Sequence, residues 1–85
     1  MKQVFITLSP VSLEQTITVF ENGKSSSTMK FKISDLEKTI FSIADIDEIT
    51  LIGSKTYTKR LGQKLKKYET TKYGATNIKY KFLEN

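Results

Sequence analysis

Short runs of β-branched and aromatic residues, several with strict alternation of apolar and polar positions, recur along the chain. This pattern is typical of strands that bury one face. Five segments carry it: 3-QVFITLS-9, 15-QTITVF-20, 28-TMKFKI-33, 48-EITLI-52 and 77-NIKYKFL-83. Pro10 ends the first strand, and Asn22-Gly23 forms a tight turn after the second, because this dipeptide readily adopts positive φ. Residues 25–28 continue this turn as a loop or start the third strand. We therefore predict that the first three strands form an antiparallel meander.

A helical period follows the third strand. Ser34-Asp35-Leu36-Glu37 has the form of a capping box, with Ser at the N-cap and Glu three residues later. Four apolar residues then lie at or near helical spacing: Leu36, Ile40, Ile43 and Ala44. This spacing predicts a helix over residues 35–44.

A second helical period covers residues 55–68. Its apolar stripe is narrow and consists of Tyr57, Leu61, Leu65 and Tyr68. Gly62 lies at the edge of this stripe, where the missing side chain permits close packing against the sheet. Residues 69–77 are predicted to be a loop, with Gly74 as a turn residue.

The order of these elements, β-β-β-α-β-α-β, predicts a single α/β (α+β) domain over residues 1–85. Because strands that follow helices return parallel, by right-handed crossovers, the simplest sheet is five-stranded and mixed. Its order is 3-2-1-4-5, with only the second strand antiparallel and two helices on one face. The residues expected beneath the helices are Ile6, Val19, Met29, Phe31, Ile33, Leu51, Ile78, Tyr80 and Phe82.

The other sheet face has no helix to cover it. Its apolar and Thr residues lie in the middle and its lysines at the edges, a composition that favours an interaction surface. The interface residues we predict are Phe5, Thr18, Phe20, Lys30, Lys32, Ile52, Lys79 and Lys81, with Thr7 and Thr16 on the same face. A homodimer is the simplest use of this face, and the alternative is that a terminus or the 9–14 loop covers it.

The amino-acid composition limits which catalytic and metal-binding sites the chain can form. The chain has no Cys and no His, so the commonest general base and metal ligand are missing, and we predict no enzyme activity, catalytic residues, cofactor or metal site. Asp45, Asp47 and Glu48 lack the spacing of a calcium loop and are interpreted as helix termination and a solvated loop. The segment 53-GSKT-56 lacks the glycines of a phosphate-binding loop and is interpreted as a strand-to-helix turn.

The positive charge is concentrated in the second half of the chain. Residues 1–45 hold five Lys and five acids, whereas residues 46–85 hold nine Lys or Arg, four acids and hence the whole net charge of +5. The nucleic-acid-binding residues we predict are Lys55, Lys59, Arg60, Lys64, Lys66, Lys67 and Lys72. Lysines position a phosphate backbone without reading bases, so this binding would have low sequence specificity. The alternatives are a solvated lysine face and a protein–protein or regulatory factor that uses the open sheet face.

The element order resembles that of the ribonuclease H-like superfamily. The segment 4-VFITLSPVS-12 looks like that superfamily's opening strand, which carries a catalytic Asp. The segment 49-ITLIGSK-55 looks like the strand whose end supplies a second acid or, in the superfamily's actin-like ATPases, a glycine turn. The chain has Leu8-Ser9-Pro10 and Ile52-Gly53-Ser54 where those acids would stand, so the resemblance implies a non-catalytic member. The composition is similar to that of small accessory proteins of phages and mobile elements. With neither a signal peptide nor a membrane-spanning stretch, we expect a soluble, cytoplasmic protein without membrane partners.

Overall fold

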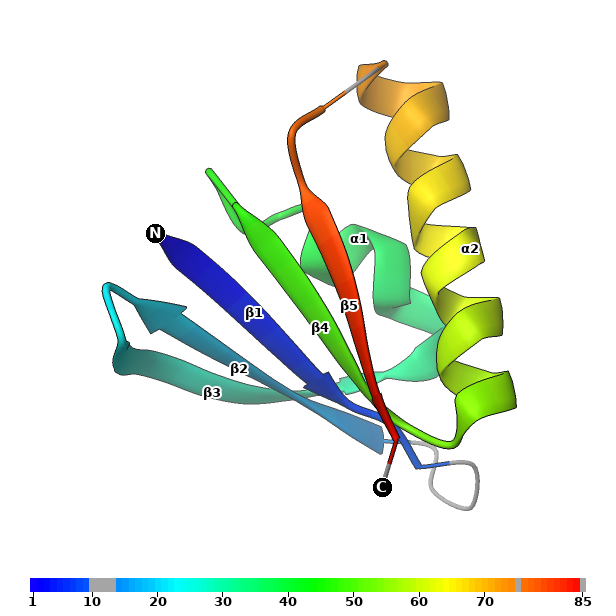
Figure 1. Ribbon diagram of the computed structural model, residues 1–85, viewed down its shortest axis with the longest axis horizontal. Helices are drawn as coiled ribbons and strands as arrows, with labels where there is room; N and C mark the ends of the chain where they lie inside the picture. Colours follow the sequence, from blue (N-terminus) through cyan, green and yellow to red (C-terminus); the bar gives the residue numbers. More distant parts are fainter. Residues whose placement is uncertain (10–13, 75, 85) are drawn as a thin grey trace.

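Five strands form one mixed sheet in the order β3-β2-β1-β4-β5 (Figure 1). The computed structural model describes residues 1–9, 14–74 and 76–84. The strands are β1 (Lys2–Thr7), β2 (Glu14–Glu21), β3 (Lys24–Lys32), β4 (Glu48–Gly53) and β5 (Lys79–Glu84). The helical elements are the 3₁₀ turn η1 (Ile33–Asp35), α1 (Leu36–Ile40) and α2 (Lys55–Tyr73). Strand β2 is antiparallel to both neighbours, and β4 is parallel to β1 and β5. The predicted fold class and strand order are confirmed.

The hairpin between β2 and β3 follows from local backbone chemistry. Asn22 and Gly23 have φ values of 53° and 81°, the left-handed conformation that a two-residue hairpin turn needs. Strand β3 begins at Lys24, so residues 25–28, left open as loop or strand, belong to the strand. Residues 24–30 are exposed, so no buried face imposes an alternating pattern on the start of this strand.

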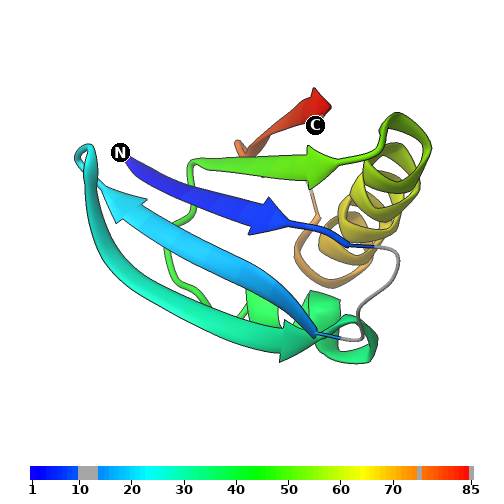
Figure 2. The same cartoon turned by 90° about the horizontal axis from the view of Figure 1, so that it is seen from below.

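Both helices cover the same face of the sheet (Figure 2). The register places Val4 opposite Val19 and Ile6 opposite Ile17, and their side chains join those of the helices in one core. That core consists of Val4, Ile6, Leu8, Ile17, Val19, Phe31, Leu36, Ile40, Ile49, Leu51, Leu61 and Leu65. Met29 and Phe82, predicted to be covered, are 37% and 46% exposed because they lie on the two edge strands.

The first helix differs from its prediction. The chain enters it through the η1 turn, and neither Lys32 nor Asp35, the two N-cap residues, makes a side-chain capping bond. Ser34 lies inside η1, so the predicted capping box does not form. The α-helix itself covers only Leu36–Ile40, and the predicted end at residue 44 was four residues too far.

The second helix is longer than predicted. It begins after Ser54, whose Oγ accepts a hydrogen bond from the Tyr57 N–H at 3.3 Å. It ends at Tyr73, followed by Gly74 with φ 74°, so residues 69–73 are helical rather than loop. Pro10 and most of the 9–14 connection lie outside the described residues. Within the described part of the chain, no helix is long and apolar enough to cross a membrane.

Gly62 allows α2 to approach β5 closely, as predicted. A β-carbon on Gly62 would lie 2.6 Å from Phe82 Cε1, 2.8 Å from Phe82 Cζ and 3.2 Å from Leu51 Cδ1. These separations are too short for a side chain at position 62 while the Phe82 ring keeps its place.

We therefore predict energetic coupling between positions 62 and 82. In a Phe82→Ala background, Gly62→Ala should stabilise the protein by up to about 1 kcal/mol, the gain in helix propensity. In the native background the same change should give no gain, because the ring must move. Urea unfolding of the four proteins measures this coupling, expected to be at least about 0.5 kcal/mol. Equal effects in both backgrounds would contradict the proposed contact.

Candidate functional site

The exposed face of α2 has cations on two sides of an uncharged row. At 100° per residue, Thr56, Gln63 and Thr70 follow one another along the middle of this face. On one side lie Lys55, Lys59 and Lys66, and on the other lie Arg60, Lys64 and Lys67. All nine residues are exposed. We call this surface the α2 cationic face. Lys72, also predicted to bind nucleic acid, lies outside it, with its Nζ 5.9 Å from the centre of the Tyr68 ring.

The single acid of α2 points away from the cationic face. Glu69 is 1% exposed, and its Oε1 accepts a hydrogen bond from the Tyr80 hydroxyl at 2.7 Å. Sequence reasoning placed Glu69 in a loop and missed this role. A signal was available, because residue 69 lies four positions after Leu65 and so continues the buried stripe of the helix.

Contacts within the chain leave the cationic face largely free to bind a ligand. Lys64 Nζ lies 3.8 Å from Glu37 Oε1, a distance typical of weak surface ion pairs. Lys66 Nζ lies 3.8 Å from Oε1 of the buried Glu69. Arg60 lies 5.7 Å from the centre of the Tyr57 ring. Within the described residues, Lys55, Lys59 and Lys67 form no ion pair.

The turn before α2 has no phosphate cradle. Gly53 is buried at the end of β4, where a β-carbon would lie 3.3 Å from atoms of Leu8 and Thr58. The Ser54 hydroxyl caps the helix. The glycine therefore serves close packing between β4 and α2, in agreement with the interpretation of 53-GSKT-56 as a strand-to-helix turn.

The uncovered sheet face brings the eight predicted interface residues onto one side. The strand register aligns Phe5 with Thr18 and Thr50, and Ile52 with Thr7. Phe5 and Phe20 pack edge to face, with ring centres 5.2 Å apart. On the edge strand β3, Lys30 and Lys32 pair with Thr16 and Glu14, towards the end of the sheet that holds Thr7. On the edge strand β5, Lys79 and Lys81 pair with Glu48 and Thr50, towards the end that holds Gln3.

Glu48 also belongs to this face, so its interpretation as part of a solvated loop was wrong, whereas Asp45 and Asp47 are exposed in the α1–β4 connection. It begins β4, is 5% exposed, and accepts a hydrogen bond from Gln3 Nε2 at 3.1 Å. Lys81 Nζ lies 3.3 Å from its other oxygen. The Gln3 hydrogen bond, together with Lys81 and Lys79, lowers the pKa of Glu48 although burial opposes this. The carboxylate therefore neutralises part of the lysine charge at this edge.

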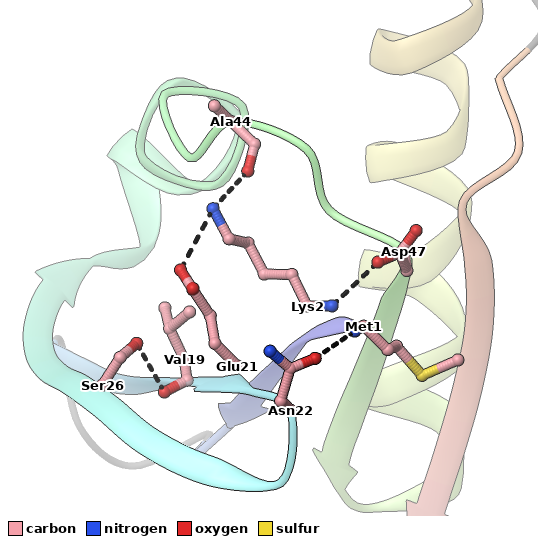
Figure 3. Close-up of polar contacts among 8 residues, drawn as sticks. All are labelled: Met1, Lys2, Val19, Glu21, Asn22, Ser26, Ala44 and Asp47. Carbon is pink, nitrogen blue, oxygen red and sulfur yellow. Dashed lines mark hydrogen bonds and ion pairs between the residues drawn. The ribbon is translucent and has the colours of Figure 1, made fainter.

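A cluster of polar contacts holds the N-terminus against the β2–β3 turn and the α1–β4 connection (Figure 3). Lys2 Nζ donates to the Ala44 carbonyl at 2.7 Å and lies 3.5 Å from Glu21, while the Lys2 backbone N–H donates to Asp47 Oδ2 at 2.8 Å. The terminal amino group donates to Asn22 Oδ1 at 2.8 Å. These contacts tie the hairpin turn to the α1–β4 connection and fix the position of Asp47.

Among the described residues, no group of three or more acidic side chains is arranged to hold a metal ion. No protein-family model matches the chain, and no curated protein or solved structure shows significant similarity to it. The resemblance to the ribonuclease H-like superfamily therefore stays a prediction.

Tyr80 provides a test of the Glu69 environment. Burial, the Glu69 hydrogen bond and the Glu69 charge raise the pKa of Tyr80 well above its ordinary value of about 10. A group with a raised folded-state pKa stabilises the protein fully below its unfolded pKa and loses that effect as pH rises above it. We expect the free energy of unfolding to fall above about pH 10, and Tyr80→Phe to weaken this fall while costing about 1–3 kcal/mol at neutral pH.

Urea unfolding between pH 8 and 11 measures both effects. Tyr73→Phe is the matched control, because Tyr73 is 56% exposed. An unchanged pH profile in Tyr80→Phe would contradict the assigned hydrogen bond.

Proposed function

We propose that the protein binds double-stranded nucleic acid, without catalysis, through the α2 cationic face. The observation that carries this proposal is the separation of charge across α2. Six cations flank an uncharged row on the exposed side, while the only carboxylate of the helix is buried on the other side.

The geometry suits a groove bounded by two phosphate backbones. The 19 residues of α2 span roughly 28 Å, slightly less than one turn of duplex DNA. A major groove about 12 Å wide admits one helix, so the two rows of cations would each approach a different strand. Thr56, Gln63 and Thr70 would then face the base edges.

Sequence specificity should be low. Lysines supply point charges that position the backbone and carry no base information. In the middle row only Gln63 has an amide that can make two hydrogen bonds with a base, and adenine is its usual partner. Affinity should therefore come mainly from phosphate contacts and counterion release.

The absence of catalysis in this proposal rests on the residues themselves. The chain has no His, and Leu8-Ser9 and Ile52-Gly53 stand where the resembling nucleases carry acids. Contacts between lysines and phosphates need no catalytic residue. A cytoplasmic location and an origin among phage or mobile-element proteins stay parts of this proposal.

We predict that replacing Lys59, Lys66 and Lys67 together by Gln weakens duplex binding roughly tenfold or more at low salt. The slope of log affinity against log salt should fall by about 2 to 3, because each lost phosphate contact removes about 0.9. Fluorescence anisotropy with a 20-base-pair duplex at several salt concentrations measures both quantities.

The matched control replaces Lys24, Lys30 and Lys32 of β3 by Gln. This triple variant has the same net charge, and all three of its lysines are exposed. It should bind nearly as well as the native protein. Equal losses in the two triple variants would mean that only net charge matters, and no binding at low salt would reject the proposal.

The uncovered sheet face supports a second proposal, self-association. The edge-to-face pair of Phe5 and Phe20 lies on a face that neither helix covers. Two copies could bury this apolar centre against each other, while their edge lysines would stay at the rim.

For this second proposal we expect Phe20→Asp to turn a dimer into a monomer. Phe20 is half-buried on the outer face, so the fold should survive the change. Light scattering at several protein concentrations measures the mass, and circular dichroism checks the fold. Thr28→Asp, on the exposed edge strand of the same face, is the control. A native protein that is monomeric at high concentration would reject the dimer.

A further inference from the structure

A pocket of about 300 Å³ lies where α1 and α2 end and where the chain enters β4 and β5. Its apolar walls include Phe41, Tyr73 and Ile78. The ring centres of Phe41 and Tyr73 are 5.7 Å apart. This volume is at the small end of the range for ligand pockets, so it suits a molecule with a single ring or a short branched chain.

The pocket is lined by acidic residues, although the chain as a whole has a net charge of +5. Asp45, Asp47 and Glu69 line it, and none of its described lining residues is basic, although the chain has 14 Lys and Arg. The C-terminus of α2 lies at the same place, since Tyr73 is both the last residue of the helix and part of the wall. The negative end of the helix dipole therefore adds to the three carboxylates.

Glu69, which lines the pocket, has one carboxylate oxygen without a hydrogen-bond partner in the described part of the chain. Its Oε1 accepts from the Tyr80 hydroxyl, whereas its Oε2 is buried and has no hydrogen-bond partner among the described residues. Lys66 Nζ is 3.8 Å from Oε1, too far for a hydrogen bond. A buried carboxylate oxygen without a donor is costly, so a cationic donor at this position would be favoured.

We propose that this pocket binds a small organic cation, a primary ammonium group on an aromatic or branched aliphatic body. The ammonium donates to Glu69 Oε2, and the body packs against Phe41 and Tyr73. Asp45 and Asp47 attract the cation, and the aromatic faces add cation–π attraction. An organic cation fits better than a metal ion, since no three acidic side chains in the described part of the chain are grouped for metal binding.

This site is separate from the proposed nucleic-acid interface. The α2 cationic face is the solvent side of the helix, whereas the pocket lies at its C-terminal end and reaches the buried Glu69. Lys66 links the two, since its Nζ lies 3.8 Å from Glu69 Oε1. The amine titration contains no nucleic acid, so amine binding can succeed or fail whether or not the protein binds a duplex.

The experiment titrates phenethylamine into the ¹⁵N-labelled protein at neutral pH and follows backbone amide shifts. The neutral probe 2-phenylethanol, which replaces the ammonium by a hydroxyl, is titrated in parallel. We expect saturable shifts at Glu69, Tyr73 and Ile78 with the amine, and binding at least about tenfold weaker with the alcohol.

Glu69→Gln removes the charge but keeps an acceptor for Tyr80, and it should weaken amine binding at least about tenfold. Asp45→Asn should weaken it by roughly two- to fivefold and is the second variant, because its φ of 58° is one that Asn tolerates. Glu37→Gln, an acid of α1 outside the pocket, is the matched control and should bind the amine like the native protein.

Amide spectra of each variant confirm its fold, and if Glu69→Gln does not fold, Asp45→Asn provides the test. Three results would overturn the proposal: no saturable shift with the amine, equal affinity for the alcohol, or native affinity in every folded pocket variant.

Discussion

The rest of the structure depends on the parallel pairing of β4 with both β1 and β5. A parallel strand must be reached by a crossover, so α1 and α2 each cross the sheet, and right-handed crossovers in one direction place both on the same face. Val4 and Ile6 of the central β1 are thereby buried under the helices. The opposite face and the outer side of α2 are left without a covering layer, and these are the two exposed surfaces for which binding is proposed.

The same arrangement explains why a carboxylate lies inside so small a protein. The covered side of α2 has to meet β4 and β5, which are close enough only because Gly62 lacks a side chain. Extension of the helix to Tyr73 turns Glu69 toward Tyr80 of the edge strand, and the Tyr80 hydroxyl satisfies one of its two oxygens. The other oxygen is buried without a hydrogen-bond partner among the residues that the structure describes. Helix α2 therefore carries its cations on the exposed face and its one acid on the buried face.

Sequence patterns predicted the strands and helices that bury one face and expose the other. They did not predict the ends of elements that lack such an alternation. Alternation located the strands, but the exposed start of β3 gave no signal, and no apolar residue continued the stripe of α2 between Tyr68 and Tyr73. The capping box failed because Ser34 already belongs to a 3₁₀ turn. The helical spacing of the lysines and Arg60 was enough to predict that they share the exposed face of α2. The spacing from Leu65 could have placed Glu69 on the buried side of α2, but its hydrogen bond to Tyr80 could not be predicted, and neither could its closeness to the acids of the α1–β4 connection, because both depend on where α2 ends.

The arrangement of lysines on α2 also bears on the choice between a binding face and a merely solvated one. Solubility requires only net charge, and interleaved acids would provide it while stabilising the helix by about 0.2–0.5 kcal/mol for each opposite pair one turn apart. Helix α2 instead places Lys55 one turn from Lys59, and Arg60 one turn from Lys64, so like charges repel at similar cost. Of the α2 cations, only Lys64 and Lys66 have a carboxylate within 4 Å among the described residues, each at 3.8 Å. A polyanion bound along this face would attract these cations and so offset their mutual repulsion, whereas water only screens it. This difference favours a binding role for the α2 cationic face over a merely solvated one.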